Sequence, residues 1–384
     1  MSWKEKTVEQ SREEFVLAAL CGEDSISELC REAGISRPTA YKWIRRYQAG
    51  EPLLDRSHTT RGHPNRTPPE TEALILEART RHPTWGGRKL IRYLQDKGYQ
   101  NLPAASTATE ILKRGGRISP EESEAHKPYR RFQKEEPNQL WQMDFKGHFA
   151  MADGRRCHPL TMSDDCSRKL LCLDAYDNER WKSVERSLLR VFSEYGLPDA
   201  ILSDNGPPWA DHTNGYTPYE IWMMQLGILP MHGRALHPQT QGKEERFHRT
   251  LKEDVLKRHT IRDLVEAQSI FDHYREEYNV ERPHAALNYD VPEKHYRSSA
   301  RKLPSTWGEP EYDAGATLRK VNCKGYLSIQ KHRYYLSESF AGKYVELLFR
   351  SENQVRVCYG AYKIAKINLS EKLFISRKIY PRDL

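Results

Sequence analysis

The chain has 384 residues, 30% of them charged and 38% hydrophobic, so it is expected to be soluble and to form two or more domains. No apolar run approaches the ~20 residues that span a bilayer, and the first residues lack the apolar stretch of a signal peptide. We therefore expect a cytoplasmic protein with no membrane partner. Seven cysteines without a CxxC pair indicate reduced thiols that are mostly buried.

The net charge of +8 is distributed unevenly along the chain. Residues 1–54 carry 8 basic and 9 acidic groups, and residues 55–136 carry 16 and 11. Residues 137–296 carry 20 and 25, and residues 297–384 carry 17 and 8. An acidic middle between basic flanks predicts flanks that contact a polyanion and a middle segment that concentrates carboxylates. Ordinary surface variation is the alternative interpretation.

Residues 1–50 are predicted to form a helix-turn-helix domain. After a first helix over residues 9–22, Ser25 can cap a second helix that ends at Gly34. Ser36 can cap a third helix with Pro38 in its first turn. Helix, short glycine-containing turn and helix is the helix-turn-helix pattern.

The third helix separates polar and basic residues from aromatic and aliphatic ones. Helical spacing turns its inward face to the core through Ala40, Trp43, Ile44 and Tyr47. The outward face is predicted to contact DNA through Arg37, Thr39, Lys42, Arg45 and Arg46. Such a face is what a helix in the major groove requires. A small bundle with a solvated basic face is the alternative.

Residues 51–69 are predicted to be a linker whose Arg61 and Arg66 follow a phosphate backbone. A second helix-turn-helix-like domain is expected over residues 70–118, followed by a linker over 119–136. Its predicted helices cover residues 70–82, 87–97 and 106–114, the last of them capped by Ser106. Its candidate DNA contacts are Arg88, Lys89, Lys113 and Arg114.

Residues 137–296 have the pattern of an α/β domain. LWQMDFKGHF, RRCHPLTMSDD and KLLCLDAY predict three strands, and ERWKSVERSLLRVFSEYG predicts an amphipathic helix. A short strand in PDAILSDNG, a helix over 218–226 and a strand in ILPMHG follow. Two further helices are expected from Gly242 onward and over 261–278. This order predicts a mixed sheet with helices on its faces.

The last part of the chain is predicted to be all-β. After a linker over residues 297–311, residues 312–384 alternate in hydrophobicity and suggest four or five short strands in a small barrel or sandwich. Basic side chains interleave there with Tyr326, Tyr334, Tyr335, Tyr359 and Tyr362. This composition suits phosphate contact and base stacking, although tyrosine is also a normal strand residue.

Three acidic positions stand where metal chemistry would need them. Asp144 interrupts an apolar strand, Asp204 ends a short strand, and Glu244 and Glu245 open a helix. A carboxylate inside an apolar strand should be paired, protonated or bound to a metal. Taken singly, each position also has an ordinary structural interpretation, such as a turn or a favourable helix start. Together, carboxylates without CxxC or HExxH motifs select a hard cation such as Mg²⁺ or Mn²⁺.

Four motifs follow one another in the middle of the chain: WQMDF, LSDNGPPW, HPQTQGKEERFHRTLKEDV and YNVERPHAALNYDVPEKHY. In this order they resemble the integrase-type catalytic core of bacterial insertion-sequence transposases, which has the ribonuclease-H-like fold of retroviral integrases. The resemblance covers about residues 137–296, and the leading helix-turn-helix pair is similar to that of other members. The zinc module of retroviral integrases is absent, so we expect no structural zinc.

The resemblance implies an Asp, Asp, Glu triad made of Asp144, Asp204 and Glu245. The intervals between them are 59 and 40 residues, and the second is slightly longer than is usual in the family. Asp144 would bridge two Mg²⁺ ions, or Mn²⁺ as a substitute, while the other two each complete one site. The implied reaction is transposition, in which water frees a 3′-hydroxyl at the element's end and that hydroxyl joins target DNA. Nearby phosphate contacts would come from Lys243, Arg249 and Lys252.

The implied partners are double-stranded element ends and target DNA, in a bacterial, nucleoid-associated setting. Two ends must meet, which implies at least a homodimer assembled on DNA. A non-catalytic DNA-binding regulator and a simple metal-dependent nuclease are the rival interpretations.

Helix spacing distinguishes the two adjacent glutamates. Glu244 follows the apolar stripe of Phe247, Leu251 and Val255, whereas Glu245 shares a face with basic residues. We therefore expect Glu245 to serve the metal and Glu244 to be dispensable for the reaction.

Overall fold

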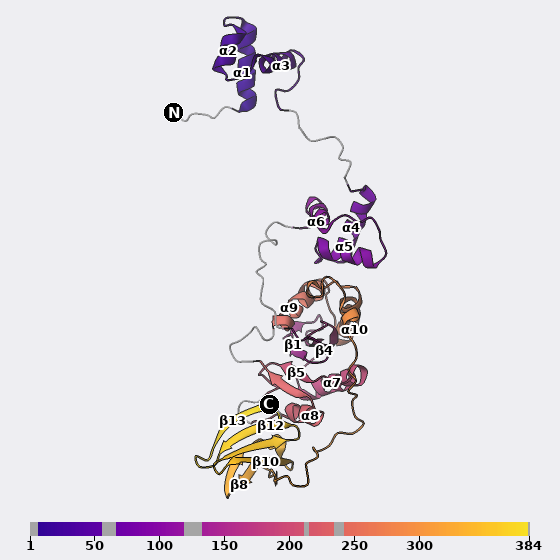
Figure 1. The fold of residues 1–384 in the computed structure, drawn as a ribbon. Coiled ribbons are helices and arrows are strands. Elements are labelled where there is room, and N and C mark those ends of the chain that lie inside the picture. The colour runs from indigo at the N-terminus through magenta and orange to yellow at the C-terminus, as the bar shows by residue number, and fades with distance from the viewer. Residues whose placement is uncertain (1–6, 56–66, 119–132, 211–214, 234–241, 383–384) are drawn as a thin grey trace. The chain divides into compact units, whose positions relative to one another are not determined.

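The computed structural model describes residues 7–55, 67–118, 133–210, 215–233 and 242–382. It divides into two compact units, Met1–Arg66 and Thr67–Leu384 (Figure 1). Each unit has its own core and is described by itself. Within the described residues, no helix is long and apolar enough to cross a membrane.

The first unit contains three helices, α1 (Val8–Cys21), α2 (Ile26–Glu32) and α3 (Arg37–Gln48). Ser25 and Ser36 cap α2 and α3 as predicted, and their hydroxyls accept hydrogen bonds from the Glu28 and Thr39 backbone amides. A small core joins the helices through Val16, Trp43, Ile44 and Leu53. The inward face of α3 follows the predicted pattern, because Ala40, Trp43 and Ile44 are buried.

The second unit begins with a helical module made of α4 (Pro69–Arg81), α5 (Gly87–Asp96) and α6 (Ala105–Arg114). Its helix boundaries lie within a residue or two of the prediction, and Gly115 follows α6. The predicted Ser106 cap is wrong, because α6 begins one residue earlier and Ala104 occupies the cap position. The module has a separate core of its own, which includes Trp85, Leu90 and Leu112.

A mixed sheet follows, and its neighbouring strands run in the order β2-β3-β1-β5-β6, with β4 pairing β3. The pairs β1–β3 and β3–β4 are antiparallel, whereas β1–β5 and β5–β6 are parallel. The strands are β1 (Trp141–Phe145), β2 (Phe149–Ala150), β3 (Arg156–Asp164), β4 (Leu170–Tyr176), β5 (Ala200–Ser203) and β6 (Leu229–His232). This arrangement is the mixed sheet that the sequence predicted.

Helices cover both faces of this sheet. Helices α7 (Trp181–Tyr195) and α8 (Pro218–Gln225) pack with Trp141 and Met143 of β1 in one core cluster. Helices α9 (Gly242–Leu251) and α10 (Leu264–Glu276) share another cluster with Leu170 and Leu173 of β4. Successive side chains of a strand point to opposite faces of the sheet. Met143 and Phe145 belong to the first cluster, so Asp144 between them faces the α9 side.

Both α9 and α10 continue into a π-helical turn, Lys252–Leu256 and Glu277–Glu281 respectively. Two short 3₁₀ turns follow, Ala285–Leu287 and Pro292–His295. The π turns were not predicted, because the local sequence there is compatible with an ordinary helix.

The C-terminal part forms an antiparallel sheet in the order β13-β12-β11-β10-β7, beside a two-stranded sheet of β8 and β9. A 3₁₀ turn, Glu338–Phe340, precedes β10. The strands are β7 (Leu318–Lys320), β8 (Tyr326–Ile329), β9 (His332–Tyr335), β10 (Tyr344–Ser351), β11 (Gln354–Tyr359), β12 (Tyr362–Asn368) and β13 (Leu373–Pro381). The all-β prediction is confirmed, while closure into a barrel stays an expectation.

Candidate active site

Two of the predicted carboxylates lie at neighbouring strand ends. Strands β1 and β5 run parallel, with Trp141 opposite Ile201 and Gln142 opposite Leu202. Continuing this register by two residues places Asp144 beside Asp204, on the same face of the sheet. The sheet therefore brings together two residues that are far apart in sequence.

Burial and nearby negative charges raise the pKa of both carboxyl groups. Burial, followed by the nearby Glu244 and Asp204 charges, raises the pKa of Asp144 to about 8. Burial also raises the pKa of Asp204, although its carboxylate accepts a hydrogen bond from the Gly206 amide at 3.1 Å. Glu179 raises both pKa values further. A site where carboxylates resist ionisation is suited to a divalent cation that would offset the repulsion.

Glu244 is the buried member of the adjacent pair on α9. Only 1% of its surface is exposed, and its carboxylate accepts hydrogen bonds from Thr161 Oγ1 at 3.0 Å and from Ser163 Oγ. Both hydroxyls come from β3, and Thr161 pairs with Asp144 across the β1–β3 ladder. The prediction that Glu244 lies on the packed stripe of α9 is confirmed, because Phe247, Leu251 and Val255 are buried beside it.

Glu245 is exposed at the first turn of α9. Among the described residues, no group of three or more His, Cys, Asp and Glu side chains is placed to hold a metal ion. The structure thus brings Asp144 and Asp204 together, whereas the participation of Glu245 stays a prediction.

His248 completes the buried side of the site and was not predicted. Its Nε2 lies 2.9 Å from Thr161 Oγ1, and its Nδ1 lies 3.9 Å from Asp144 Oδ2. Burial, with a further contribution from Lys146, lowers the pKa of His248 to about 4. The ring is therefore neutral at neutral pH and cannot form an ion pair with Asp144 or Glu244. Thr161 and His248 could have been found by assigning the β1–β3 register and the i, i+4 spacing from Glu244.

The basic residues predicted near the triad have different surroundings. Lys243 Nζ pairs with the buried carboxylate of Asp165, and burial lowers the pKa of Lys243 to about 8. Arg249 and Lys252 are exposed on α9 and on the π turn that follows it. These last two are available to a phosphate, whereas Lys243 already has a partner.

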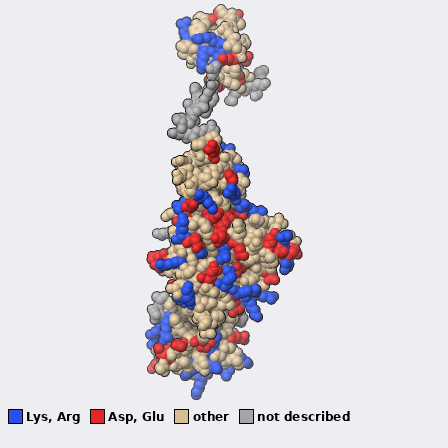
Figure 2. Space-filling view, turned by 90° about the vertical axis from the view of Figure 1, so that its right-hand side faces the viewer, with Lys and Arg blue, Asp and Glu red and all other residues tan. Residues whose placement is uncertain are grey.

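The predicted DNA-reading face of α3 is partly used inside its own unit. Arg37, Lys42 and Arg45 are exposed. Arg46 instead packs on Trp43 at 4.9 Å and donates a hydrogen bond to the Leu54 carbonyl at 3.0 Å. Thr39 Oγ1 lies 2.8 Å from Ser36 Oγ, within the cap. Figure 2 shows Lys and Arg gathered in a patch on this unit.

The other candidate DNA contacts are distributed over several places. Arg61 and Arg66 lie outside the described residues. In the helical module, Lys113 pairs with Glu110 at 2.8 Å, and Arg114 pairs with Glu72 at 2.9 Å. Arg88 is exposed and lies 3.4 Å from Tyr289 Oη, and burial lowers the pKa of Lys89 to about 7.

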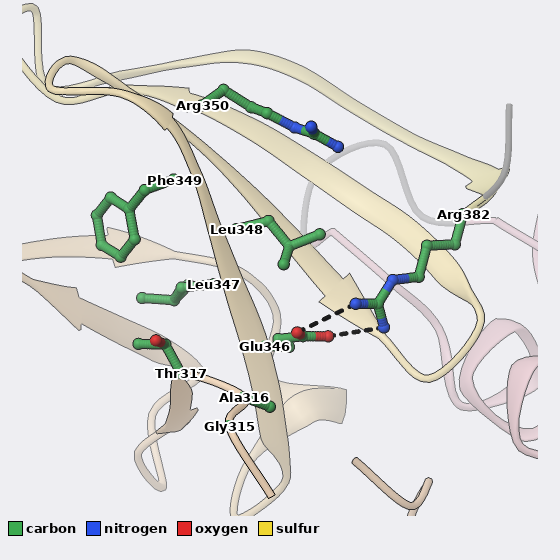
Figure 3. Close-up of a pocket in the computed structure, with 9 residues that line it drawn as sticks. All are labelled: Gly315, Ala316, Thr317, Glu346, Leu347, Leu348, Phe349, Arg350 and Arg382. Atoms are coloured by element: carbon green, nitrogen blue, oxygen red, sulfur yellow. Dashed lines mark hydrogen bonds and ion pairs between the residues drawn. The ribbon is translucent and has the colours of Figure 1, made fainter. Parts of the chain in front are cut away.

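A surface hollow on the C-terminal sheet contains none of the predicted catalytic residues. It is lined by β10 residues and by Arg382, which forms an ion pair with Glu346 at 2.8 Å (Figure 3).

Comparisons with known proteins agree with this geometry. Residues 134–238 and 226–292 match two families described as integrase core domain. Residues 11–62 match a helix-turn-helix domain, and residues 39–112 match a homeodomain-like domain.

Individual relatives come from bacterial insertion elements. A protein of insertion element IS136 from Agrobacterium fabrum is 31% identical over 35% of this chain and 75% of its own length. A candidate transposase for insertion sequence element IS5376 from Geobacillus stearothermophilus is 21% identical over 91% of this chain and 85% of its own length. The match spans only 54% and 43% of two other insertion-element proteins.

A solved structure of the HTLV-2 integrase catalytic core domain in complex with magnesium aligns with 43% of this chain and all of that one. The identity is 16% and the TM-score is 0.33. From the matched domains and the IS136 relative, the chain belongs to the insertion-element transposases that have an integrase core domain and N-terminal helix-turn-helix domains.

Proposed function

We propose that the chain is a DNA transposase that binds the ends of a mobile element, exposes their 3′-hydroxyls and joins them to target DNA. The observation that carries this proposal is the placement of Asp144 beside Asp204, facing the helix that bears Glu245. Membership of the insertion-element transposases supports it, and so does the exposed basic face of α3.

The carboxylates fit a hard divalent cation. Asp144, Asp204 and Glu245 offer only oxygen donors, which suit Mg²⁺ and Mn²⁺. Held by these three residues, two such ions would supply Lewis-acid activation of the attacking oxygen and stabilisation of the leaving one. The raised pKa of Asp144 marks a place where a positive charge would stabilise the carboxylate.

The surrounding residues orient the carboxylates. Thr161 Oγ1 lies 3.0 Å from the Asp144 carbonyl oxygen and 3.0 Å from Glu244 Oε2 on α9, and its single proton can be donated to one of them at a time. Neutral His248 fills the space beside Asp144 without competing with a cation for the carboxylate. Exposed Arg249 and Lys252 would bind phosphates of the DNA, which fixes the strand in register.

We further infer that the active assembly is at least a dimer on DNA, because two element ends have to be joined. Residues on both flanks of the core would contribute contacts, namely the α3 face and the C-terminal sheet.

Asp144→Asn tests the proposal directly. The variant should bind labelled end DNA with unchanged affinity and lose cleavage and joining with Mg²⁺ by roughly a thousandfold or more. Chelation of the metal should have the same effect on the unsubstituted chain.

One incubation with end DNA, a plasmid and Mg²⁺ separates the rival functions. Joined products support a transposase, cuts without joining support a nuclease, and binding alone supports a regulator. Cleavage by Asp144→Asn at the normal rate would refute the assigned site.

A further inference from the structure

The C-terminal end of α9 is fixed by a buried carboxylate that no step of the proposed chemistry uses. Asp254 lies in the π-helical turn that continues α9, and it is 7% exposed. Its Oδ2 accepts a hydrogen bond from Tyr274 Oη at 3.0 Å and pairs with the guanidinium of Arg282. Both partners belong to the α10 side of the mixed-sheet domain. A buried carboxylate needs hydrogen-bond donors or a cation beside it, and Asp254 has a third partner besides these two.

That further partner comes from the helical module, far away in sequence. Thr84, in the turn between α4 and α5, donates a hydrogen bond to Asp254 Oδ1 at 2.5 Å. Next to it, His82 Nδ1 lies 2.9 Å from Glu277 Oε1, and the His82 ring stacks on Trp85 at 3.8 Å. The two contacts join one turn of the module to both π turns of the core.

Charged pairs surround this contact at the surface. Lys97 of the module pairs with Glu281 at 2.8 Å, and Arg92 pairs with Asp290 at 3.4 Å. The module and the α9–α10 face have separate hydrophobic clusters, so the contact between them is predominantly polar. A polar contact between two bodies with their own cores depends on a few specific hydrogen bonds and can change between states.

The position of Asp254 links this contact to the candidate active site. Asp254 lies nine positions after Glu245 along α9 and its π turn, which corresponds to about 14 Å of helix. Phe247 and Leu251, between them, are buried against the sheet. Any shift or rotation of the π turn is therefore transmitted along a rigid helix to the glutamate at its start. π turns within helices are frequent at functional positions.

We propose that Thr84 and Asp254 are positioning residues, which set α9 and its Glu245 according to how the helical module is docked. DNA engaged by the module would then act on the active site through this contact. The inference rests on the proposed function for its catalytic consequence, but the coupling between module and helix is independent of it.

Thr84→Val tests the coupling, because valine keeps the shape and removes the hydroxyl donor. In the full chain, backbone amides of α9 should exchange hydrogen faster in Thr84→Val than in the unsubstituted protein. The turnover rate of strand joining at saturating end DNA should fall between about twofold and thirtyfold. The DNA concentration for half-maximal rate should change little, because no DNA contact is removed.

Two matched variants separate positioning from general destabilisation. Thr84→Ser keeps the hydroxyl and should restore both exchange and rate. Thr80→Val removes a hydroxyl of the same module that donates a hydrogen bond to the Leu76 carbonyl within its own helix, and it should leave both unchanged.

The outcomes for the inference and for the function are distinct. If the unsubstituted chain neither cuts nor joins DNA, the proposed function fails, while the exchange comparison still tests the coupling. If Thr84→Val matches the unsubstituted chain in α9 exchange and in rate, the coupling is refuted.

Discussion

At the scale of single residues, the two adjacent glutamates of α9 have opposite environments. Glu244 is buried and bonded to two hydroxyls of β3, whereas Glu245 is exposed. Burial raises the pKa of Glu244 to about 7, so its neutral form is close in free energy to the charged one at neutral pH. An uncharged amide of the same size should therefore be tolerated there.

The expected result is a contrast between two neighbouring amide variants. Glu245→Gln should reduce strand joining by roughly a thousandfold or more, because it would lose a metal ligand. Glu244→Gln should keep the rate within about tenfold, since its amide oxygen can still accept one of the two hydrogen bonds. Both rates are measured with end DNA and Mg²⁺, after melting temperatures confirm folding. The reverse order of activities would assign the metal to Glu244.

From the sequence, the two aspartates of this site were easier to find than the residues around them. Asp144 and Asp204 were identifiable because a carboxylate in an apolar strand and one at a strand end are unusual. Thr161 and His248 were missed, because their proximity to Asp144 depends on strand register and on the docking of α9. Arg46 lies against Trp43 and the Leu54 carbonyl, contacts that helical spacing alone does not reveal, and its DNA contact stays a prediction.

At the scale of elements, local signals located helices to within about three residues. Cap residues and glycines fixed α2 and α3, since those interactions are between near neighbours. The contact between the helical module and the π turns was not predicted. It joins His82 to Glu277 and Thr84 to Asp254, and no local pattern encodes a pairing at that separation.

The C-terminal sheet is joined to the mixed-sheet domain at the segment before α8. Gly215 pairs with Ser337 in an isolated bridge, and Ser337 Oγ donates a hydrogen bond to the Tyr216 carbonyl at 2.6 Å. Tyr216 also packs in the core cluster of the C-terminal sheet. The segment that follows Asp204 is thereby attached to a second domain, which was not evident from its sequence.

Gly215→Ala should destabilise this attachment strongly. Gly215 has a φ of +89°, and an added Cβ would clash with the Leu336 carbonyl oxygen, which is backbone and cannot move away. Gly342 is the matched control, because its φ is +80° and nothing lies within 4 Å of an added Cβ. Both alanine variants carry a conformational cost of about 1–2 kcal/mol, and Gly215→Ala adds about 1–3 kcal/mol of overpacking. Urea unfolding compares the two, and equal losses would show that the bridge is unimportant.

At the scale of the whole molecule, the basic helix α3 and the candidate catalytic carboxylates lie in different units. The first unit has its own small core and an exposed basic face on α3. The second unit contains the carboxylates and the helix that bears Glu245. Substitutions on the α3 face should therefore change DNA affinity without changing the rate of strand chemistry.

Replacing all three of Arg37, Lys42 and Arg45 by Gln should weaken binding to end DNA. The rate of strand joining at saturating DNA should not change. Each lost phosphate contact should make the slope of log affinity against log salt shallower by about 0.9, because fewer counterions are released. The melting temperature should fall only slightly, since these side chains are exposed and only the contact of Lys42 Nζ with the Trp43 ring at 4.7 Å is lost from the core.

A second triple variant removes the same charge elsewhere. Arg155, Lys257 and Arg262 are exposed in the second unit and pair with Asp153, Glu253 and Glu266. Their replacement by Gln changes the net charge equally but should leave the salt dependence nearly unaltered, because these cations are already neutralised by carboxylates. If both triple variants reduced the slope to the same extent, net charge rather than the α3 face would account for DNA binding. An unchanged slope in the α3 variant would likewise exclude that helix as a phosphate-contacting element.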